Sequence, residues 1–257
     1  MRIYIGLDDT DTIDAPFGTG KLARWLSAAL PDGCRCQGVV RQQLLVSPEI
    51  AYTSHNSAAC ILADVAAAAL LPAVIDQAVR TIVDNAVPGS DPGLCVVTES
   101  DPALPGLMAF GRACTHRVCT RSQATAAAGA AHLSGHGGTD DGIIGAAAAV
   151  GLTAEGWLGR YIELDGLRDT PAEVSVAQLR TRGIRVMAVD RDAPAPAPED
   201  RVLTNGWLRP MHMARGPVLL VGCEAPGLWR NLHAKKRKHG RGLDTPQCAG
   251  AVKTAAR

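Results

Sequence analysis

Four aspartates stand within seven residues near the N-terminus, directly after the strand-like segment 2–7. They are Asp8, Asp9, Asp11 and Asp14. Carboxylates this close repel one another, so the cluster is costly unless a cation lies beside it. Hard oxygen ligands of this kind suit Mg²⁺, which commonly bridges to substrate phosphates. The cluster therefore indicates a Mg²⁺ site, with a solvated aspartate-rich turn as the alternative. If the strand continues, Asp9 and Asp11 face one side and Asp8 the other.

A glycine-containing loop at 17–21, Phe-Gly-Thr-Gly-Lys, could present backbone N–H groups to a phosphate. It fails the Walker A pattern, because Ala15 occupies the first glycine position and Leu22 follows the lysine. Its glycines still permit an anion to approach closely, and Thr19 can cap the helix that follows. Lys21 is the only lysine in the first 234 residues. A surface position on that helix is its other interpretation.

A second glycine loop, 135–142, leads into the small-residue segment 143–150. Glycines before a helix again let a phosphate approach the helix N-terminus, and His136 could add a donor. The alternative is a tight connection into a closely packed alanine helix, since glycine patterns alone are weak evidence. Two such loops together with the acidic cluster favour a nucleotide–Mg²⁺ site.

The eight cysteines are scattered along the chain and include no C-x-x-C pair. The only cluster is Cys-Thr-His-Arg-Val-Cys at 114–119. Structural zinc sites usually need two closely spaced Cys/His pairs, so we expect reduced, mostly buried thiols rather than a metal site.

The elements that must position these residues follow from hydrophobic periodicity and turn signals. We expect strands over 3–7, 39–46, 58–65 and 94–98, and helices over 20–30, 70–87, 106–132 and 143–150. This mixture without strict alternation predicts an α+β layered fold.

A second unit is expected after Gly151. We expect strands over 161–164, 184–189 and 217–221, and a helix over 174–182. The Ala-Pro repeat at 193–198 is typical of a stiff connector. Apolar periodicity fades beyond Glu224, which predicts a poorly ordered tail.

With 257 residues, 47% hydrophobic and 20% charged, the chain is neither disordered nor fibrous in composition. No apolar run reaches the roughly 18–20 residues that a membrane helix needs, and we see no signal peptide, so we expect a cytoplasmic protein without a membrane partner. The net charge of +1 hides an asymmetry, because residues 225–257 hold eight Lys/Arg and one acid. That basic tail is either an RNA-binding arm or a solvated terminus.

Several of these motifs resemble one family. The segment 6–11, Gly-Leu-Asp-Asp-Thr-Asp, resembles the N-terminal signature of the archaeal-type isoleucine-tRNA 2-agmatinylcytidine synthases. The segment 142–146, Gly-Ile-Ile-Gly-Ala, is similar to their second glycine segment, and 91–93 extends the similarity. The resemblance covers roughly residues 1–224, and the aspartate motif is its most specific part.

The resemblance implies a mixed-sheet, kinase-like domain that binds ATP and Mg²⁺ over 1–155. A smaller ferredoxin-like α/β domain follows over 156–224, and the basic, flexible tail occupies 225–257. In the family, ATP activates the base carbonyl of a cytidine by phosphorylation, and the amine of agmatine then displaces the phosphate.

Site residues carry over from the matching motifs. The implied catalytic residues are Asp8, Asp9, Asp11 and Thr19, and the three aspartates also hold Mg²⁺. The residues implied to bind the nucleotide are Thr10, Gly137, Gly138 and Gly142, to which the two glycine loops add Lys21 and His136 as expected nucleotide-binding residues. Phosphoryl transfer needs mainly positioning and charge neutralisation, which such residues supply.

The sequence also departs from the family. We find neither its OB-like domain nor its cysteine-pair zinc ribbon, both of which bind tRNA. Its Lys-Thr-Arg-Gly-Asn segment reads Tyr-Thr-Ser-His-Asn at 52–56, which loses two cations. Thr53 and Asn56 remain, and with Arg41 they are the expected substrate-binding residues. Fewer phosphate contacts predict weaker RNA binding.

We therefore expect an ATP- and Mg²⁺-dependent enzyme that activates a nucleobase for attack by an amine. The expected partners are tRNA or another RNA, bound through the basic tail, and a small-molecule amine or metabolite. One alternative is a small-molecule kinase or ligase with the same nucleotide site. The other is a non-catalytic RNA-binding or partner protein.

Overall fold

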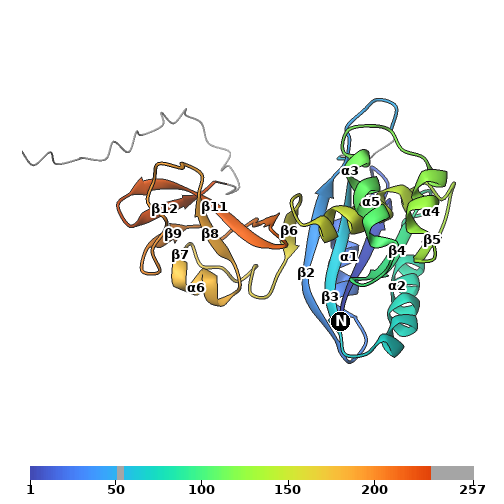
Figure 1. The fold of residues 1–257 in the computed structure, drawn as a ribbon, viewed down its shortest axis with the longest axis horizontal. Coiled ribbons are helices and arrows are strands. Elements are labelled where there is room, and N and C mark those ends of the chain that lie inside the picture. The colour runs from blue at the N-terminus through green and yellow to red at the C-terminus, as the bar shows by residue number, and fades with distance from the viewer. Residues whose placement is uncertain (51–54, 233–257) are drawn as a thin grey trace, which may run out of the picture. The chain divides into compact units, whose positions relative to one another are not determined.

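The computed structural model describes residues 1–50 and 55–232, which divide into two compact units (Figure 1). Unit 1 comprises Met1–Asp165 together with Met211–Gly216. Unit 2 comprises Gly166–Pro210 and the described chain from Pro217. The first boundary lies at Asp165 rather than at residue 155, because the strand expected over 161–164 pairs within the sheet of unit 1.

Unit 1 is built on a sheet whose central strand carries the aspartate motif at its end. In order across the sheet, the strands are β5 (His132–Gly135), β4 (Gly93–Thr98), β1 (Arg2–Asp8), β3 (Ser57–Val65), β2 (Cys34–Gln43), β6 (Arg160–Glu163) and β10 (Met211–Met213). Each of these neighbours pairs in the antiparallel sense. The site therefore lies at one end of a strand that is hydrogen-bonded on both sides.

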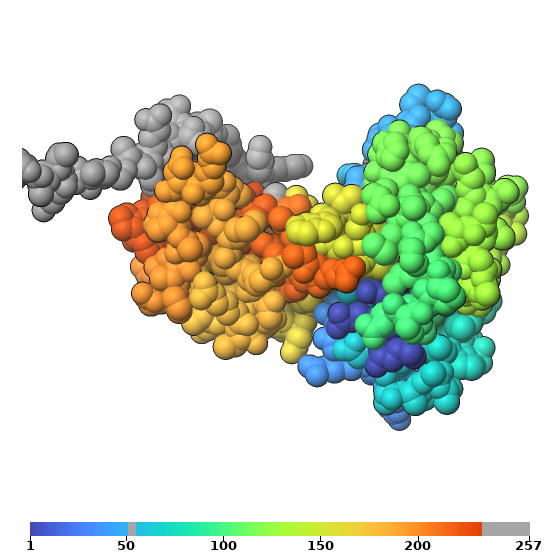
Figure 2. Space-filling view, viewed as in Figure 1, coloured from blue at the N-terminus to red at the C-terminus, as the bar shows by residue number. Residues whose placement is uncertain are grey.

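Helices cover both faces of this sheet. Ile3, Ile5 and Leu7 of β1 face α1 (Thr19–Ala28) and α2 (Leu71–Asn85), which follows the short 3₁₀ helix η1 (Ala68–Leu70). Tyr4 points to the other face, where α3 (Leu104–Cys114), α4 (Arg121–Ala128) and α5 (Gly142–Glu155) pack. Figure 2 shows the green residues of α3 at the surface of unit 1. The period-two alternation of β1 thus produces two cores, one on each side.

Helix α5 lies unusually close to the sheet because both contact surfaces are made of small residues. A Cβ added at Gly6 of β1 would overlap the carbonyl oxygen of Ala146, and one at Gly93 of β4 would overlap the backbone of Gly142. Nearly every residue of α5 is buried. The alanine- and glycine-rich composition therefore brings the first turn of α5 against the end of β1.

Unit 2 is a smaller α+β unit. Its elements are β7 (Glu173–Ser175), α6 (Val176–Thr181), β8 (Arg185–Ala188), β9 (Arg201–Leu203), β11 (Gly216–Ala225) and β12 (Leu228–Asn231). Strand β11 pairs antiparallel with β12 and parallel with β8, while β9 pairs parallel with β12 and antiparallel with β7. Buried Trp229 anchors the last strand, since its indole N–H donates to Asp200 at 2.8 Å.

The structure confirms an α+β fold with a large mixed sheet and corrects several elements. The helix expected over 106–132 is two helices and a strand, because the capping box of Thr120 and Gln123 starts α4 afresh and Gly129 ends it. The segment expected over 174–182 as a helix begins as strand β7. Strand β12 lies in the tail expected to be poorly ordered. The ferredoxin-like character of the second unit stays a prediction.

Among the described residues, no helix is both long enough and apolar enough to cross a membrane.

Candidate functional site

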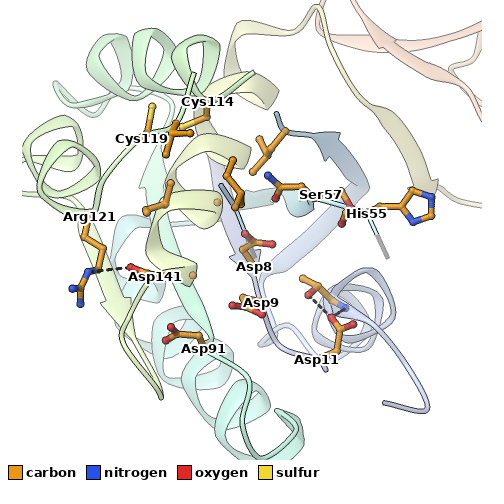
Figure 3. A pocket seen from close by; sticks show the side chains of 18 of the residues that line it. Asp8, Asp9, Asp11, His55, Ser57, Asp91, Cys114, Cys119, Arg121 and Asp141 are labelled. Carbon is orange, nitrogen blue, oxygen red and sulfur yellow. Dashed lines mark hydrogen bonds and ion pairs between the residues drawn. The ribbon is translucent and has the colours of Figure 1, made fainter. Parts of the chain in front are cut away.

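A cavity of about 920 Å³ opens in unit 1 at the end of β1 (Figure 3). Its walls come from the end of β1, the start of α1, the segments that flank residues 51–54, the α3–α4 connection and the first turn of α5. Segments far apart in the sequence therefore meet around the aspartate motif.

Asp8 is the last residue of β1 and lies against α5. A Cβ at Gly145 would overlap the Asp8 carboxylate, so only glycine at this helix position leaves room for it. Burial raises the pKa of Asp8 to about 7, and the charges of Asp9 and Asp11 add to the rise. A carboxylate held in this way favours either a proton or a cation beside it.

Asp9 leaves the strand, with a φ of 51° in the left-handed region. The expectation that Asp9 and Asp11 share one strand face is therefore wrong, because β1 ends at Asp8. Burial raises the pKa of Asp9 to about 6, with further contributions from Asp91 and Asp11. Asp8 and Asp9 together form the β1 end, where two carboxylates that line the cavity have raised pKa values.

Asp11 holds the start of α1. Its Oδ1 accepts hydrogen bonds from the backbone N–H of Thr19 at 2.9 Å and from the Thr19 hydroxyl at 3.0 Å. The Thr19 Oγ1 also lies 3.1 Å from the hydroxyl of buried Thr10. Thr19 is the first residue of α1 rather than its cap, and Gly18 in the cap position supplies no side chain. Asp11 therefore satisfies a free N–H of the helix, as a capping side chain would.

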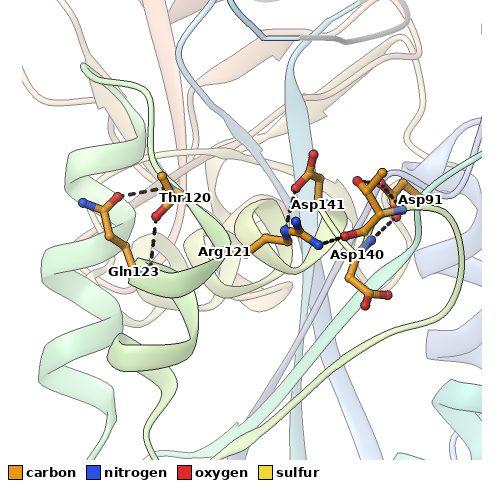
Figure 4. A network of polar contacts seen from close by, with 7 residues as sticks. Asp91, Thr120, Arg121, Gln123, Asp140 and Asp141 are labelled. Atoms are coloured by element: carbon orange, nitrogen blue, oxygen red, sulfur yellow. Dashed lines mark hydrogen bonds and ion pairs between the residues drawn. The ribbon is translucent and has the colours of Figure 1, made fainter.

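Asp91 is one of three acidic residues of the cavity, with Glu49 and Asp141, that the sequence did not single out as site residues. Its carboxylate accepts bonds from Thr139 N at 3.0 Å, Thr139 Oγ1 at 2.6 Å and Asp140 N at 2.7 Å (Figure 4). Burial alone would raise the pKa of Asp91, but these hydrogen bonds outweigh it and lower the pKa. We call this arrangement of Asp91, Thr139 and Asp140 the Asp91 turn. Its only signal in the sequence was the family-like segment 91–93.

Arginine side chains also line the cavity, and the sequence did not predict most of them as site residues. Arg121 pairs with Asp141, Nε to Oδ1 at 3.1 Å, and donates to the carbonyl of Thr139. Arg117 lies in the same α3–α4 connection and lines the cavity. The segment that carries these arginines was expected to be part of a single long helix. The sequence therefore did not predict that their side chains would line a cavity.

The expected substrate-binding residues are partly brought to the cavity. Arg41 and Asn56 both line it. Arg41 Nε donates to Ser57 Oγ at 2.9 Å, and Asn56 Nδ2 donates to the carbonyl of Leu45 at 2.6 Å. Thr53 lies outside the described residues, as does the tail from residue 233.

Other expected nucleotide-binding residues lie beside the cavity rather than on its wall. Lys21 is exposed, with Nζ 5.1 Å from the Trp25 ring centroid and 5.8 Å from that of Phe17. His136 contacts Ser134 Oγ at 2.9 Å through Nε2. Gly138 packs against Asp91, so it supports the Asp91 turn. Of the predicted nucleotide-binding residues, Gly142 is the one that lines the cavity, whereas Thr10 is buried and Gly137 and Gly138 are exposed outside the lining.

A ready-made cluster for a metal ion is absent from the described residues, in which no three His, Cys, Asp or Glu side chains are grouped suitably. The three-aspartate Mg²⁺ site is thus not preformed, since Asp11 is bound to Thr19. Mg²⁺ needs only one or two protein carboxylates when waters and phosphates complete its shell. The β1 end meets this smaller requirement. The seven described cysteines are free thiols, as expected.

Comparison with solved structures finds proteins that share the fold of part of this chain. The structure of a tRNA fluorescent labeling enzyme matches with a TM-score of 0.51 and 27% identity, over 59% of this chain and 36% of that chain. Apo TiaS, an agmatidine synthetase for an isoleucine tRNA, matches with a TM-score of 0.50 and 25% identity, over 59% and 35%. The complex of TiaS with that tRNA, AMPCPP and agmatine gives 0.50 and 26%, over 59% and 36%.

These matches concern a part of larger proteins, since this chain spans little more than a third of each. No protein-family profile and no curated protein sequence matches the chain. Over 59% of its length, this chain shares its fold with the TiaS structures, which confirms the family resemblance seen in the aspartate motif.

Proposed function

We propose that this protein is an ATP- and Mg²⁺-dependent enzyme that activates an oxygen of a nucleobase by phosphorylation, so that an amine can replace it. The solved TiaS complexes contain ATP or its analogue AMPCPP, tRNA and agmatine, which supports ATP and an RNA as substrates here. The likeness covers about a third of those proteins, so the activity is inferred for this chain rather than transferred whole.

The observation that carries the proposal is the unbalanced charge of the β1 end. Asp8 and Asp9 have pKa values raised to about 7 and about 6 in a cavity large enough for a nucleotide. Burial and neighbouring carboxylates raise both values, and a cation there would offset both effects by favouring the charged forms. The site therefore fits Mg²⁺, held by Asp8 and Asp9, which would neutralise phosphate charge during transfer.

The remaining residues position the substrates. Gly18 and Gly20 line the cavity without side chains at the start of α1, so backbone there can approach a phosphate closely. The Asp11–Thr19 hydrogen bonds keep that helix start in place. The Asp91 turn does the same for α5, because Gly142 N donates to the Asp91 carbonyl at 3.1 Å.

The proposed chemistry proceeds in two displacements. The base oxygen bonds to the transferred phosphorus of ATP as the bond from that phosphorus to its leaving group breaks. The amine nitrogen then bonds to the ring carbon, and inorganic phosphate departs with the original oxygen. Both steps gain from fixed geometry and from the cations of the cavity, which stabilise the transferred negative charge.

Calorimetric titration of the full chain with ATP, with and without Mg²⁺, tests the proposal. We expect binding that depends on Mg²⁺, followed by ATP turnover that rises when bulk tRNA and an amine are added. Absence of ATP binding would overturn the proposal.

A second candidate keeps the nucleotide site but changes the acceptor. The cavity of about 920 Å³ has room for a nucleotide together with a small molecule, which favours a small-molecule kinase or ligase. ATP turnover that rises with a small-metabolite extract, and not with tRNA, would identify this activity.

A further inference from the structure

Two arginines lie directly opposite each other beside the cavity. Arg41 of β2 and Arg160 of β6 are register partners in an antiparallel pair. Residues in such a position project from the same face, with Cβ atoms about 4.5–5.5 Å apart, and like charges there repel each other. The sequence had drawn attention to Arg41 alone.

The arginine pair faces the α1 side of the sheet. The neighbouring partners, Val40 and Tyr161, both pack into the core on the α3–α5 side, so the next pair along the strands points the other way. Ile162 of β6 lies on the α1 side, where its Cδ1 would be 3.1 Å from a Cβ at Gly20. The pair therefore lies near the start of α1, whose Gly18 and Gly20 line the cavity together with Arg41.

Neither arginine has its charge balanced. Within residues 1–50 and 55–232, neither guanidinium forms an ion pair with a carboxylate. Nη1 of Arg160 is buried and has no hydrogen-bond partner in that part of the chain. Burial lowers the pKa of both side chains, which reflects the cost of holding each cation there. An anion beside them would balance the positive charge and accept the unmet hydrogen bond of Arg160.

We propose that Arg41 and Arg160 form an anion subsite that binds a phosphate group of the acceptor substrate. Guanidinium groups match phosphate oxygens with paired N–H donors, and the start of α1 favours negative charge nearby. The subsite is separate from the β1 end, whose carboxylates repel a phosphate that lacks a metal ion. This inference rests on the proposed function, in which the acceptor is a nucleotide unit and carries a phosphate.

The first test measures binding of inorganic phosphate to the full chain by calorimetry and by thermal shift. We expect Arg160→Gln and Arg41→Gln to weaken phosphate binding by about tenfold or more, because each removes charge-assisted hydrogen bonds. Arg160→Lys keeps the positive charge but loses the paired N–H donors of the guanidinium. Its phosphate affinity should therefore lie between those of wild type and Arg160→Gln. Arg80→Gln is the matched control, since Arg80 is exposed on α2 and donates to Gln77 at 3.1 Å, outside the cavity.

The second test separates the acceptor from ATP. We expect Arg160→Gln to bind MgATP within about twofold of wild type. Parallel loss of phosphate and MgATP binding would overturn the proposal, because the pair would then belong to the ATP site. Unchanged phosphate affinity in both glutamine variants would also overturn it. If wild type fails to bind MgATP while the variants still lose phosphate, the proposed function fails and the anion subsite stands.

Two probes identify the source of the phosphate. A short cytidine oligoribonucleotide presents a phosphodiester, and cytidine 5′-monophosphate presents a free nucleotide phosphate. The subsite binds the kind of phosphate that is carried by the probe whose affinity for wild type falls about tenfold in Arg160→Gln. Should neither probe distinguish wild type from Arg160→Gln, the assignment to the acceptor is wrong. If Arg160→Gln does not fold, Arg41→Gln and Arg160→Lys provide the same comparison.

Discussion

The β1 end and the Asp91 turn are two acidic regions of one cavity in which the pKa of a carboxylate shifts in opposite directions. At the β1 end, burial and neighbouring charges raise the pKa of Asp8 to about 7. In the Asp91 turn, three donors from Thr139 and Asp140 lower the pKa of Asp91 despite its burial. The difference teaches that residue type does not assign a role here. A carboxylate whose hydrogen bonds outweigh its burial holds the backbone, whereas Asp8, whose burial outweighs its hydrogen bond from the backbone of Asp9, is available to a cation.

Backbone geometry strengthens this contrast. Asp9 occupies the left-handed region, at a φ of 51°, and its carbonyl accepts the backbone N–H of Asp91 at 3.1 Å. The Asp91 turn therefore fixes the backbone of the β1 end while leaving its side chains free for a ligand. Strain of this kind persists when the surrounding structure compensates for it.

The largest effect is expected from Gly145→Ala, which breaks the contrast by driving a methyl group into Asp8. We expect the free energy of unfolding to fall by about 2–3 kcal/mol, as for overpacked cores, although alanine favours a helix. Chemical denaturation measures this loss, and MgATP binding should be lost with it. The double variant Asp8→Ala/Gly145→Ala should recover part of the stability. A single variant as stable as wild type would contradict the close packing.

Asp9→Asn is expected to weaken MgATP binding by about tenfold or more, because it removes a charge from the proposed metal site. Calorimetry in the presence of Mg²⁺ measures the change. Asp14→Asn is the control, since Asp14 is exposed and does not line the cavity. Equal affinities in the two variants would argue that the β1 end holds no metal.

Replacing Asp91 and Asp8 in turn should change stability in opposite directions. Asp91→Asn replaces one of the two carboxylate oxygens that accept three hydrogen bonds with an NH2 group, so we expect the free energy of unfolding to fall by about 1 kcal/mol. Asp8→Asn removes a buried charge, so it should raise the stability of the metal-free protein at pH 8 by an amount on the order of 1 kcal/mol. Denaturation without Mg²⁺ compares the two. If both variants changed the free energy of unfolding in the same direction, the contrast between the β1 end and the Asp91 turn would be wrong.

The smallest effect is expected from Thr139→Val, which removes one donor to Asp91 and keeps the branched shape. We expect a loss of about 0.5–1 kcal/mol at pH 7. Because the folded pKa of Asp91 is lowered, its contribution is present above the unfolded pKa of about 3.8 and lost as pH falls through the folded value. The difference between wild type and variant should therefore shrink in acid. A difference independent of pH would assign the loss to packing.

Strands β1 to β4 of unit 1 were predictable because each has a local signature, whereas β5 and β10 were not expected. Alternation over residues 3–7 indicated β1, and the small-residue run after the second glycine loop indicated α5. The α3–α4 connection was missed because its alanine-rich flanks continue a helical pattern. Only the capping box at Thr120 and the turn at Gly129 interrupt that pattern, and neither is strong in one sequence.

Only the β1 end of the candidate site could be predicted from the sequence. The aspartate motif is contiguous, so its charge density could be read directly. Asp91, Arg121 and Asp141 come from segments whose meeting depends on how α5 packs against β1 and β4. Lys21 was expected at the nucleotide because of its position after two glycines, but the helix turns it toward Phe17 and Trp25.

The sequence by itself determined that a dense cluster of carboxylates ends a buried strand and that small residues start a helix elsewhere. Both are local properties of neighbouring residues. Only the tertiary structure decided that burial outweighs hydrogen bonding at Asp8, that hydrogen bonding outweighs burial at Asp91, and that Arg41 and Arg160 are register partners. Burial, hydrogen bonding and charge repulsion act through space, so they depend on contacts between segments separated by many residues along the chain.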